Sequence, residues 1–265
     1  MATTFRREIK NKFAFMEKEI PAWVSVSGMI VLVVSWEMIC RLGVVSELYL
    51  PSPASILKAS WMMLANGELV GSAKASLYRI GMGFSIGSSA GILIGLILGF
   101  SKIAEALGNP LIYSIYPIPK IALLPLIILW LGIGEISKVT IISLGVFFPV
   151  VINTYSGVKH VDKSLIKVAI SFGSTRFSLI RKVILPGALP MIFTGLKLAA
   201  GTSLLLLVAA EMIAAKEGIG SIILHYGDLM LTTKLMVGVL ALSVLGVLFT
   251  NLIGWIEKLV IRWKK

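Results

Sequence analysis

The stretch GMGFSIGSSAGILIGLILGF, residues 81–100, decides the fold of this chain. It carries no charged residue over a length that suffices to cross a bilayer, about 20 residues. Small residues let helix backbones approach closely in lipid, and steps of four on a helix trace a gently winding groove. The stretch therefore predicts a spanning helix that packs tightly in a bundle or at a dimer interface, with ligand contact as the alternative, through glycines at every fourth position: Gly83, Gly87, Gly91, Gly95 and Gly99.

The composition of the whole chain agrees with a membrane protein. Of its 265 residues, 57% are hydrophobic and 14% are charged, and the mean hydropathy is +0.94. Soluble domains contain about 25% charged residues, and disordered chains have low hydrophobicity. The single cysteine, Cys40, excludes a disulfide scaffold. These values predict an all-α membrane protein.

Six apolar segments predict six transmembrane helices. The third contains Pro110, Pro117, Pro119 and Pro125 and should be broken, because proline removes a backbone donor. Residues 1–21 predict an amphipathic cytoplasmic helix, 22–257 a transmembrane domain and 258–265 a basic tail. The expected spans are 22–40, 76–100, 104–134, 138–155, 191–215 and 235–256.

The net charge of +12 is concentrated on one face of the predicted bundle. An even number of spans puts both termini and the loop 156–190 on the same side. That loop, the first 21 residues and the tail are all basic, so the positive-inside rule predicts N-in and C-in. No DNA-binding motif accompanies the charge, which predicts membrane lipids and not nucleic acid as a partner. The predicted location is therefore a membrane crossed several times, with its basic side facing the cytoplasm.

Catalytic chemistry has little support in the sequence. His160 and His225 fall on opposite faces of the bilayer, so they cannot share a metal ion. No nucleophile elbow, paired intramembrane aspartates or phosphate-binding GK[ST] loop is present. We therefore expect no catalytic residue, metal or cofactor on this chain.

Polar and charged residues inside spans are costly and are candidates for a translocation pathway. The candidates are Glu37, Asn153, Lys197 and Glu211, although snorkelling to the interface is an alternative for the charged ones. Lys197 in the cytoplasmic half of its span would lower the barrier for an anion. Arg79 is expected to be an interfacial anchor.

The segment HVDKSLIKVAISFGSTRFSLIRKVILPGALPMIFTG, residues 160–195, is a basic loop with two helical patches. Gly173 between them predicts a turn, and Pro186 and Pro190 predict an interruption of regular helix before the fifth span. Amphipathic helices lying on lipid headgroups would explain these features alone.

The spacing in this segment resembles the cytoplasmic EAA loop of ABC-importer permeases. Matching positions are Ala169, Gly173, Val183, Leu185 and Pro186, whereas Lys167 and Val168 stand where the family has Glu and Ala. Further stretches resemble the nitrate/taurine/alkanesulfonate branch, in which Arg is common at the position of Lys197. They are residues 48–53, 76–87, 117–135, 147–158, 183–201 and 209–223.

The resemblance implies a type I ABC-importer permease that forms a pathway with a second copy, so a homodimer is expected. Two P-loop ATPase subunits, which hold ATP and Mg²⁺, would bind the cytoplasmic face, and an extracytoplasmic solute-binding protein would deliver the solute. The loop 158–190 would form the coupling helix, with ATPase contacts at Lys163, Lys167, Val168, Ala169, Phe172, Gly173, Ser174, Arg176 and Pro186.

The cargo that the resemblance implies is a small anion such as an alkanesulfonate, taurine or nitrate. Bicarbonate, aromatic sulfonates and pyrimidine or riboflavin-like compounds stay open as alternatives. An ion-coupled secondary transporter, which commonly shows internal repeats, and an intramembrane enzyme are the rival classes.

Overall fold

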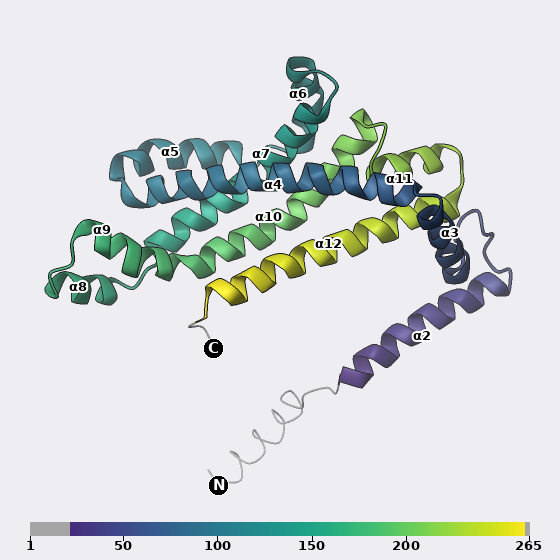
Figure 1. Ribbon diagram of the computed structural model, residues 1–265, viewed down its shortest axis with the longest axis horizontal. Helices are drawn as coiled ribbons and strands as arrows, with labels where there is room; N and C mark the ends of the chain where they lie inside the picture. Colours follow the sequence, from purple (N-terminus) through teal and green to yellow (C-terminus); the bar gives the residue numbers. More distant parts are fainter. Residues whose placement is uncertain (1–21, 263–265) are drawn as a thin grey trace, which may run out of the picture.

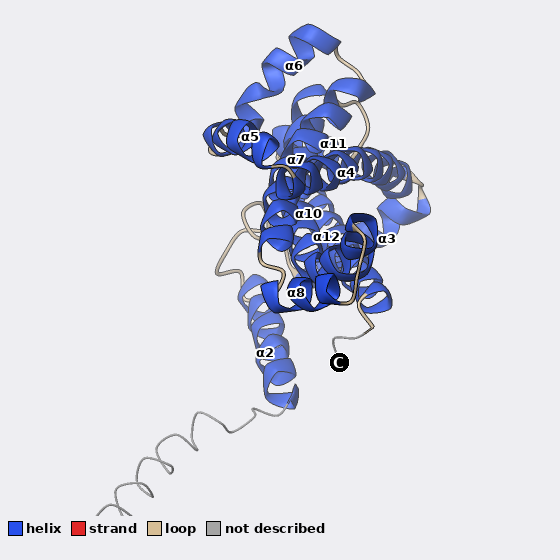
Figure 2. Cartoon of the chain, turned by 90° about the vertical axis from the view of Figure 1, so that its left-hand side faces the viewer, coloured by secondary structure: helices blue, strands red, loops and turns tan. Residues whose placement is uncertain are grey.

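The computed structural model describes residues 22–262, and every regular element in that range is helical, as the composition predicts. The long helices run together along the longest axis of the molecule, and α2 stands apart from them in both views (Figures 1 and 2). In chain order the elements are α2 (Ala22–Arg41), α3 (Pro53–Ala65), α4 (Glu68–Phe100), α5 (Lys102–Ile115), η1 (Lys120–Leu123), α6 (Leu124–Leu131), α7 (Glu135–Lys159), α8 (Lys163–Ser171), α9 (Arg176–Leu179), η2 (Ile180–Ile184), α10 (Leu185–Ala214), α11 (Ile219–Asp228) and α12 (Thr232–Val260).

Four helices are long and apolar enough to cross a membrane: α4, α7, the continuous helix Arg176–Ala214, and α12. A fifth candidate joins α5 to the segment Lys120–Leu131 through a bend of 87°, so the predicted break of the third region is confirmed. Helix α2 covers the expected first span. The total of six spans stays a prediction, and the amphipathic helix expected at 1–21 lies outside the described residues.

Helices α4 and α7 run parallel with their backbones in close contact. A methyl group at Gly91 would lie 2.9 Å from the Phe147 carbonyl oxygen and 2.9 Å from Val150 Cβ. The same offset along the sequence joins Gly83 to Ile142 and Gly99 to Val158. The structure therefore places the glycine groove against α7 of the same chain, where a larger side chain would force the two helices apart.

Pro186 and Pro190 were expected to interrupt regular helix before the fifth span; the chain departs from α-helix only in one π-helical turn just before Pro186 and otherwise stays helical over Arg176–Ala214. The backbone passes through a π-helical turn, η2, in which the Leu185 N–H donates to the Ile180 carbonyl. Pro186 follows this turn as the second residue of α10, so its missing N–H falls where the wider π turn joins the α-helix. Pro190 lies inside α10, so the helix accepts the loss of one backbone hydrogen bond.

Pro149 is also accommodated inside a helix, α7. It cannot donate to the carbonyl of Gly145, four residues earlier. The Thr202 hydroxyl of α10 donates to that carbonyl instead, at 3.2 Å. A side chain from a neighbouring helix thus supplies the donor that the proline removes, as lipid cannot.

The core of the bundle lies where α10 packs against the α4–α7 pair. Ile142, Val146 and Val150 of α7 and Leu207 and Ala210 of α10 are fully buried there. Many other apolar side chains face outward, as expected for helices whose outer surface meets lipid.

Candidate functional site

The segment between α7 and α10 forms a short helix with defined ends. The Asp162 side chain caps α8 by accepting the Ser164 N–H at 2.7 Å. At the other end Gly173 has a φ of +72°, and its N–H donates to Ile170 O while the Ser174 N–H donates to Ala169 O. This is a Schellman motif, which ends α8 and turns the chain towards α9.

Helix α8 and the turn after it expose apolar side chains instead of burying them. Phe172 is 86% exposed and Phe177 is 72% exposed, and Leu165, Val168 and Ile170 are each more than half exposed. The cations of this segment, Lys163, Lys167 and Arg176, are exposed as well, whereas Ala169, Ser174 and Pro186 are partly buried. We call residues 163–177 the α8–α9 surface. Apolar side chains exposed together mark a site for a partner or for lipid.

The α8–α9 surface lies at one end of the bundle. The end of α12 points towards the same side, whereas α3 and α11 lie at the opposite end (Figure 1). Seen from the α8 end, α8 lies across the long helices (Figure 2). Its attachment to the starts of α9, η2 and α10 links any displacement of α8 to the fifth predicted span.

At the opposite end, a buried ion cluster joins four helices. Arg79 of α4 donates to Glu211 of α10 through Nη1, at 2.7 Å, and to Glu135 of α7 through Nε and Nη2, at 2.7 and 2.8 Å. Lys138 adds a second cation beside Glu135 at 2.9 Å. Arg79 is 4% exposed, so its expected place as an interfacial anchor is wrong: two carboxylates compensate its charge within the protein.

The loop before α11 and the first turn of α11 close this cluster: the Glu217 carbonyl of the loop accepts from Arg79, and Gly220 lies in the first turn of α11. The Gly220 N–H donates to Glu211 at 2.8 Å, and Ser76 donates to the same carboxylate at 2.7 Å. Gly218 has a φ of +139°, and a methyl group there would lie 2.5 Å from the Glu211 carboxylate. Glu211 has no exposed surface in this chain, so it acts in this structure as an anchor for the loop.

The pathway candidates from the sequence do not meet in one site. Lys197 of α10 forms an ion pair with Glu257 of α12, and both side chains are partly exposed. Glu37 lies near the end of α2, where it bonds Arg41 at 2.7 Å and the Ala54 N–H at 3.1 Å. Asn153 donates to the Pro149 carbonyl at 2.8 Å, on the side of α7 that meets Gly195.

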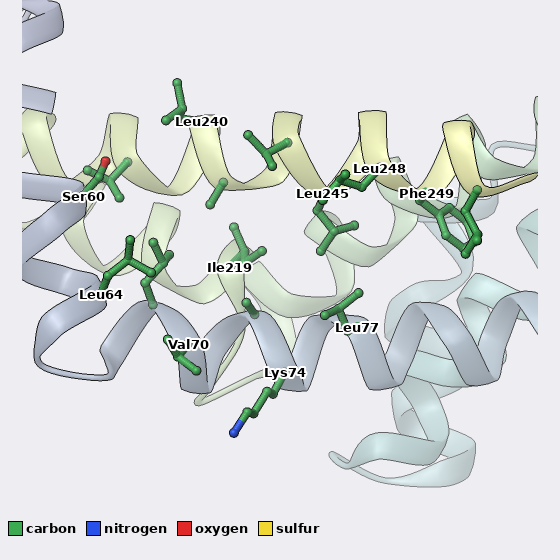
Figure 3. Close-up of a pocket in the computed structure, with 16 residues that line it drawn as sticks. Ser60, Leu64, Val70, Lys74, Leu77, Ile219, Leu240, Leu245, Leu248 and Phe249 are labelled. Carbon is green, nitrogen blue, oxygen red and sulfur yellow. The ribbon is translucent and has the colours of Figure 1, made fainter. Parts of the chain in front are cut away.

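A long apolar groove of about 590 Å³ runs between α3, α4, α11 and α12 (Figure 3). Leu64, Val70, Leu77, Leu245 and Phe249 line it, and the charged end of Lys74 points away from them. A groove of this chemistry suits acyl chains or another helix and offers nothing to a hydrophilic solute.

Within residues 22–262, no three His, Cys, Asp or Glu side chains are grouped so that they could hold a metal ion.

Sequence reasoning missed Glu135, Lys138 and Glu257, the partners of the intramembrane charges. Arg79 and Lys197 are each an isolated cation in an apolar span, and such a charge needs a counter-ion. These two cations therefore indicate in the sequence that acidic partners exist. Sequence alone could not identify that counter-ion, because Arg79 and Glu211 lie on different helices.

Residues 91–262 match the family described as binding-protein-dependent transport system inner membrane component. The chain is 37% identical over 234 residues to SsuC of Bacillus subtilis, named for aliphatic sulfonates transport, covering 88% of this chain and 85% of that protein. It is 34% identical over 230 residues to the taurine transport system permease protein of Escherichia coli, covering 85% and 84%.

A nitrate import permease of Synechocystis is 29% identical over 265 residues, covering 97% of this chain and 94% of that protein. Among solved structures, inward-facing MetNI, a methionine ABC transporter, superposes with a TM-score of 0.60 at 20% identity, covering 76% of this chain and 96% of that chain. An amino acid ABC transporter superposes with a TM-score of 0.54 at 19% identity, covering the same shares. These two structures show that the fold is shared.

Proposed function

The chain belongs to the family of binding-protein-dependent transport system inner membrane components, and we propose the cargo that it carries, its orientation in the membrane and the surface that binds its ATPase. A member of this family is a non-catalytic membrane permease of an ABC importer, and the ATPase is a separate subunit. The family thus implies an ATPase and a solute-binding protein as partners, with ATP and Mg²⁺ acting on the ATPase.

We propose that the α8–α9 surface is the docking site for the ATPase. The observation that carries this proposal is the helix α8, closed at both ends by its own caps, with Val168 and Phe172 exposed beside cations. A helix that is capped at both ends resists deformation when the ATPase moves it. Because α8 is connected to the continuous helix Arg176–Ala214, that movement would be transmitted to a membrane span. Lys167 is exposed and joins no ion pair within residues 22–262, so it is free for a carboxylate of the partner.

We propose further that the α8 end faces the cytoplasm of a bacterial cell, with both termini on that side. The end that carries α8 also carries Arg176, Arg181 and Lys182, and the end of α12 contributes Lys258 and Arg262. Basic residues accumulate on cytoplasmic loops. The pathway itself would form between two copies of the chain.

The proposed cargo is a small anion, such as an alkanesulfonate, taurine or nitrate. Three relatives are named for aliphatic sulfonates, for taurine and for nitrate. All of these compounds carry negatively charged oxygen atoms, and this shared feature supports the proposal. Bicarbonate, aromatic sulfonates and neutral pyrimidine or riboflavin-like compounds are the competing cargoes.

Uptake of labelled taurine into cells that express this chain with its ATPase and binding protein tests the proposed cargo. We expect ethanesulfonate or nitrate to compete with taurine and uracil not to compete. Competition by uracil alone would overturn the assignment to anions while leaving the permease assignment intact.

A further inference from the structure

A cavity of about 460 Å³ lies between η1, α7 and α10, apart from the apolar groove. The side chains that decide its chemistry are Tyr116, Lys120, Phe148, Thr202, Leu205 and Leu206. Its volume falls in the range of small-molecule sites, about 300–1,000 Å³. Leu205 is 73% exposed, so the cavity opens to the surface of the chain beside this residue.

The cavity lies near the middle of the predicted membrane layer. Phe148 is roughly 20 Å along α7 from Glu135, and Thr202 is roughly 18 Å along α10 from Ala214, at 1.5 Å per residue. Irregular backbone at this depth is tolerated only where protein or water satisfies its polar groups. The bend between α5 and α6 supplies such backbone at this place.

Lys120 satisfies part of that backbone. Its ammonium group donates to the Ile115 carbonyl at 3.2 Å and to the Tyr116 carbonyl. The Ile118 N–H also donates to the Ile115 carbonyl, at 3.2 Å, whereas Pro119 has no N–H and cannot make the bond of a regular helical turn. The same ammonium group lies 4.4 Å from the centre of the Phe148 ring and 5.2 Å from that of the Tyr116 ring.

The charge of Lys120 has no carboxylate partner among the described residues. By contrast, three other lysines each pair with a glutamate of the described residues: Lys138 with Glu135, Lys159 with Glu105 and Lys197 with Glu257. An ammonium group has three donors, and the two carbonyls occupy two of them. An uncompensated cation at this depth is costly and favours an anionic ligand that completes its partners.

The rest of the cavity wall fixes the class of ligand. The Thr202 hydroxyl donates to the carbonyls of Gly145 and Ala199, so its proton is not available to a ligand. The Lys120 ammonium group is therefore the cationic side-chain donor that an anion in this cavity can use. Leu205 and Leu206 offer an apolar wall for a short carbon chain.

We propose that Lys120 is the anion-recognising residue of the translocation pathway, in a cavity that takes a small oxyanion with a short aliphatic tail, such as an alkanesulfonate. This inference rests on the proposed function and deepens it: it puts part of the cargo selectivity in the permease itself. The cavity holds the anionic group at Lys120 and the carbon chain along α10.

Thiol labelling of the full chain in lipid nanodiscs tests the charge of the cavity directly. In a Cys40→Ser background, Leu205→Cys reports from the cavity and Leu240→Cys from the apolar groove. The probes are anionic 2-sulfonatoethyl methanethiosulfonate and cationic 2-trimethylammonioethyl methanethiosulfonate. The ratio of their rates at each cysteine cancels differences in accessibility.

We expect Lys120→Gln to lower the anionic-to-cationic rate ratio at Leu205→Cys by about five-fold or more, because the ammonium charge attracts the anionic reagent and repels the cationic one. Gln keeps amide donors for the backbone carbonyls, and Lys120→Arg keeps the charge and should keep the ratio. The ratio at Leu240→Cys should not change. An unchanged ratio at Leu205→Cys in the Gln variant overturns the proposal and leaves Lys120 as a cap of α5.

Protection gives a second, independent measurement on the same protein. Ethanesulfonate should slow labelling of Leu205→Cys when Lys120 is present, and the neutral ethyl methyl sulfone should not. Equal protection by both compounds would also overturn the proposal. Neither measurement needs the ATPase. If the labelling results contradict the proposal while the wild-type chain binds its ATPase, the anion site alone is refuted. If the wild-type chain does not bind an ATPase, the proposed function is refuted.

Discussion

Arg79 and Glu211 form a buried ion pair between α4 and α10, with Nη1 2.7 Å from Oε1. Their side chains are 5% and 0% exposed, and Glu135 adds a second carboxylate beside Arg79. Together with Glu135 and the backbone of Gly220, the pair fixes the relative position of the helix ends at the side opposite α8.

Removing one charge from this pair should destabilise the protein strongly. We expect Glu211→Gln to lower the free energy of unfolding by about 1.5–3 kcal/mol, because it removes one of the two carboxylates that bond the buried Arg79 and leaves Glu135 as the other. Thermal unfolding of the detergent-solubilised chain measures the loss. Glu37→Gln is the matched control, since Glu37 lies outside the cluster and pairs with the exposed Arg41. Equal stability of the Glu211 variant and the wild type would show that the cluster does not hold the helix ends.

A larger side chain at the contact between α4 and α7 should destabilise the protein, because the two helices touch there through their backbones. Gly91→Val places side-chain atoms where the Phe147 carbonyl and Val150 already lie, and we expect a loss of at least about 1–3 kcal/mol from overpacking. Gly81→Val on the same helix meets no atom within 4 Å and serves as the control. Thermal stability and yield of folded protein are the measurements, and a Gly91 variant as stable as its control would contradict the packing.

The turn after α8 should require a residue that tolerates a positive φ. Gly173→Val forces a β-branched residue into the left-handed region, at a cost of about 1–2 kcal/mol, whereas Gly173→Asn should be accepted more readily. We expect faster amide hydrogen exchange at Phe172 and Ser174 in the Val variant and near-normal exchange in the Asn variant. If both variants exchange like the wild type, the turn does not control the end of α8.

The contact between the start of α4 and the end of α11 should weaken at alkaline pH through one tyrosine. The Tyr226 hydroxyl donates to Glu68 at 2.6 Å, and this hydrogen bond raises the pKa of Tyr226 from 10.0 to about 12. The neutral phenol is the form that bonds, so its contribution is complete below pH 10.0 and is lost as the pH rises towards 12. Tyr226→Phe should remove this part of the pH dependence of stability, and tyrosinate absorbance follows the titration. A Tyr226 that titrates at its ordinary pKa would contradict the hydrogen bond.

The sequence predicts those features that depend on local chemistry. The glycine spacing of 83–99 identifies a close helix contact, and Gly173 identifies a turn, because each follows from the geometry of a single helix. The family resemblance, which the comparisons confirm, comes from motifs of the same local kind.

Features that depend on meetings between distant segments could not be predicted in this way. Arg79 is an interfacial anchor by sequence position alone, yet the loop before α11 folds back to bury it. Lys197 reads as an unpaired cation until α12 is seen to extend to Val260 and bring Glu257 beside it. Pro186 breaks a regular α-helix, but the π turn before it absorbs the change.

We propose that the ATPase binds at the α8–α9 surface, and site-directed cross-linking tests this proposal directly. In the Cys40→Ser background, Phe172→Cys carries a photoreactive maleimide at the α8 end, and Leu229→Cys carries the same group at the end with α11. In the assembled importer, irradiation should join the ATPase to Phe172→Cys and not to Leu229→Cys. A cross-link from Leu229→Cys, or none from Phe172→Cys in a complex that hydrolyses ATP, would contradict the account.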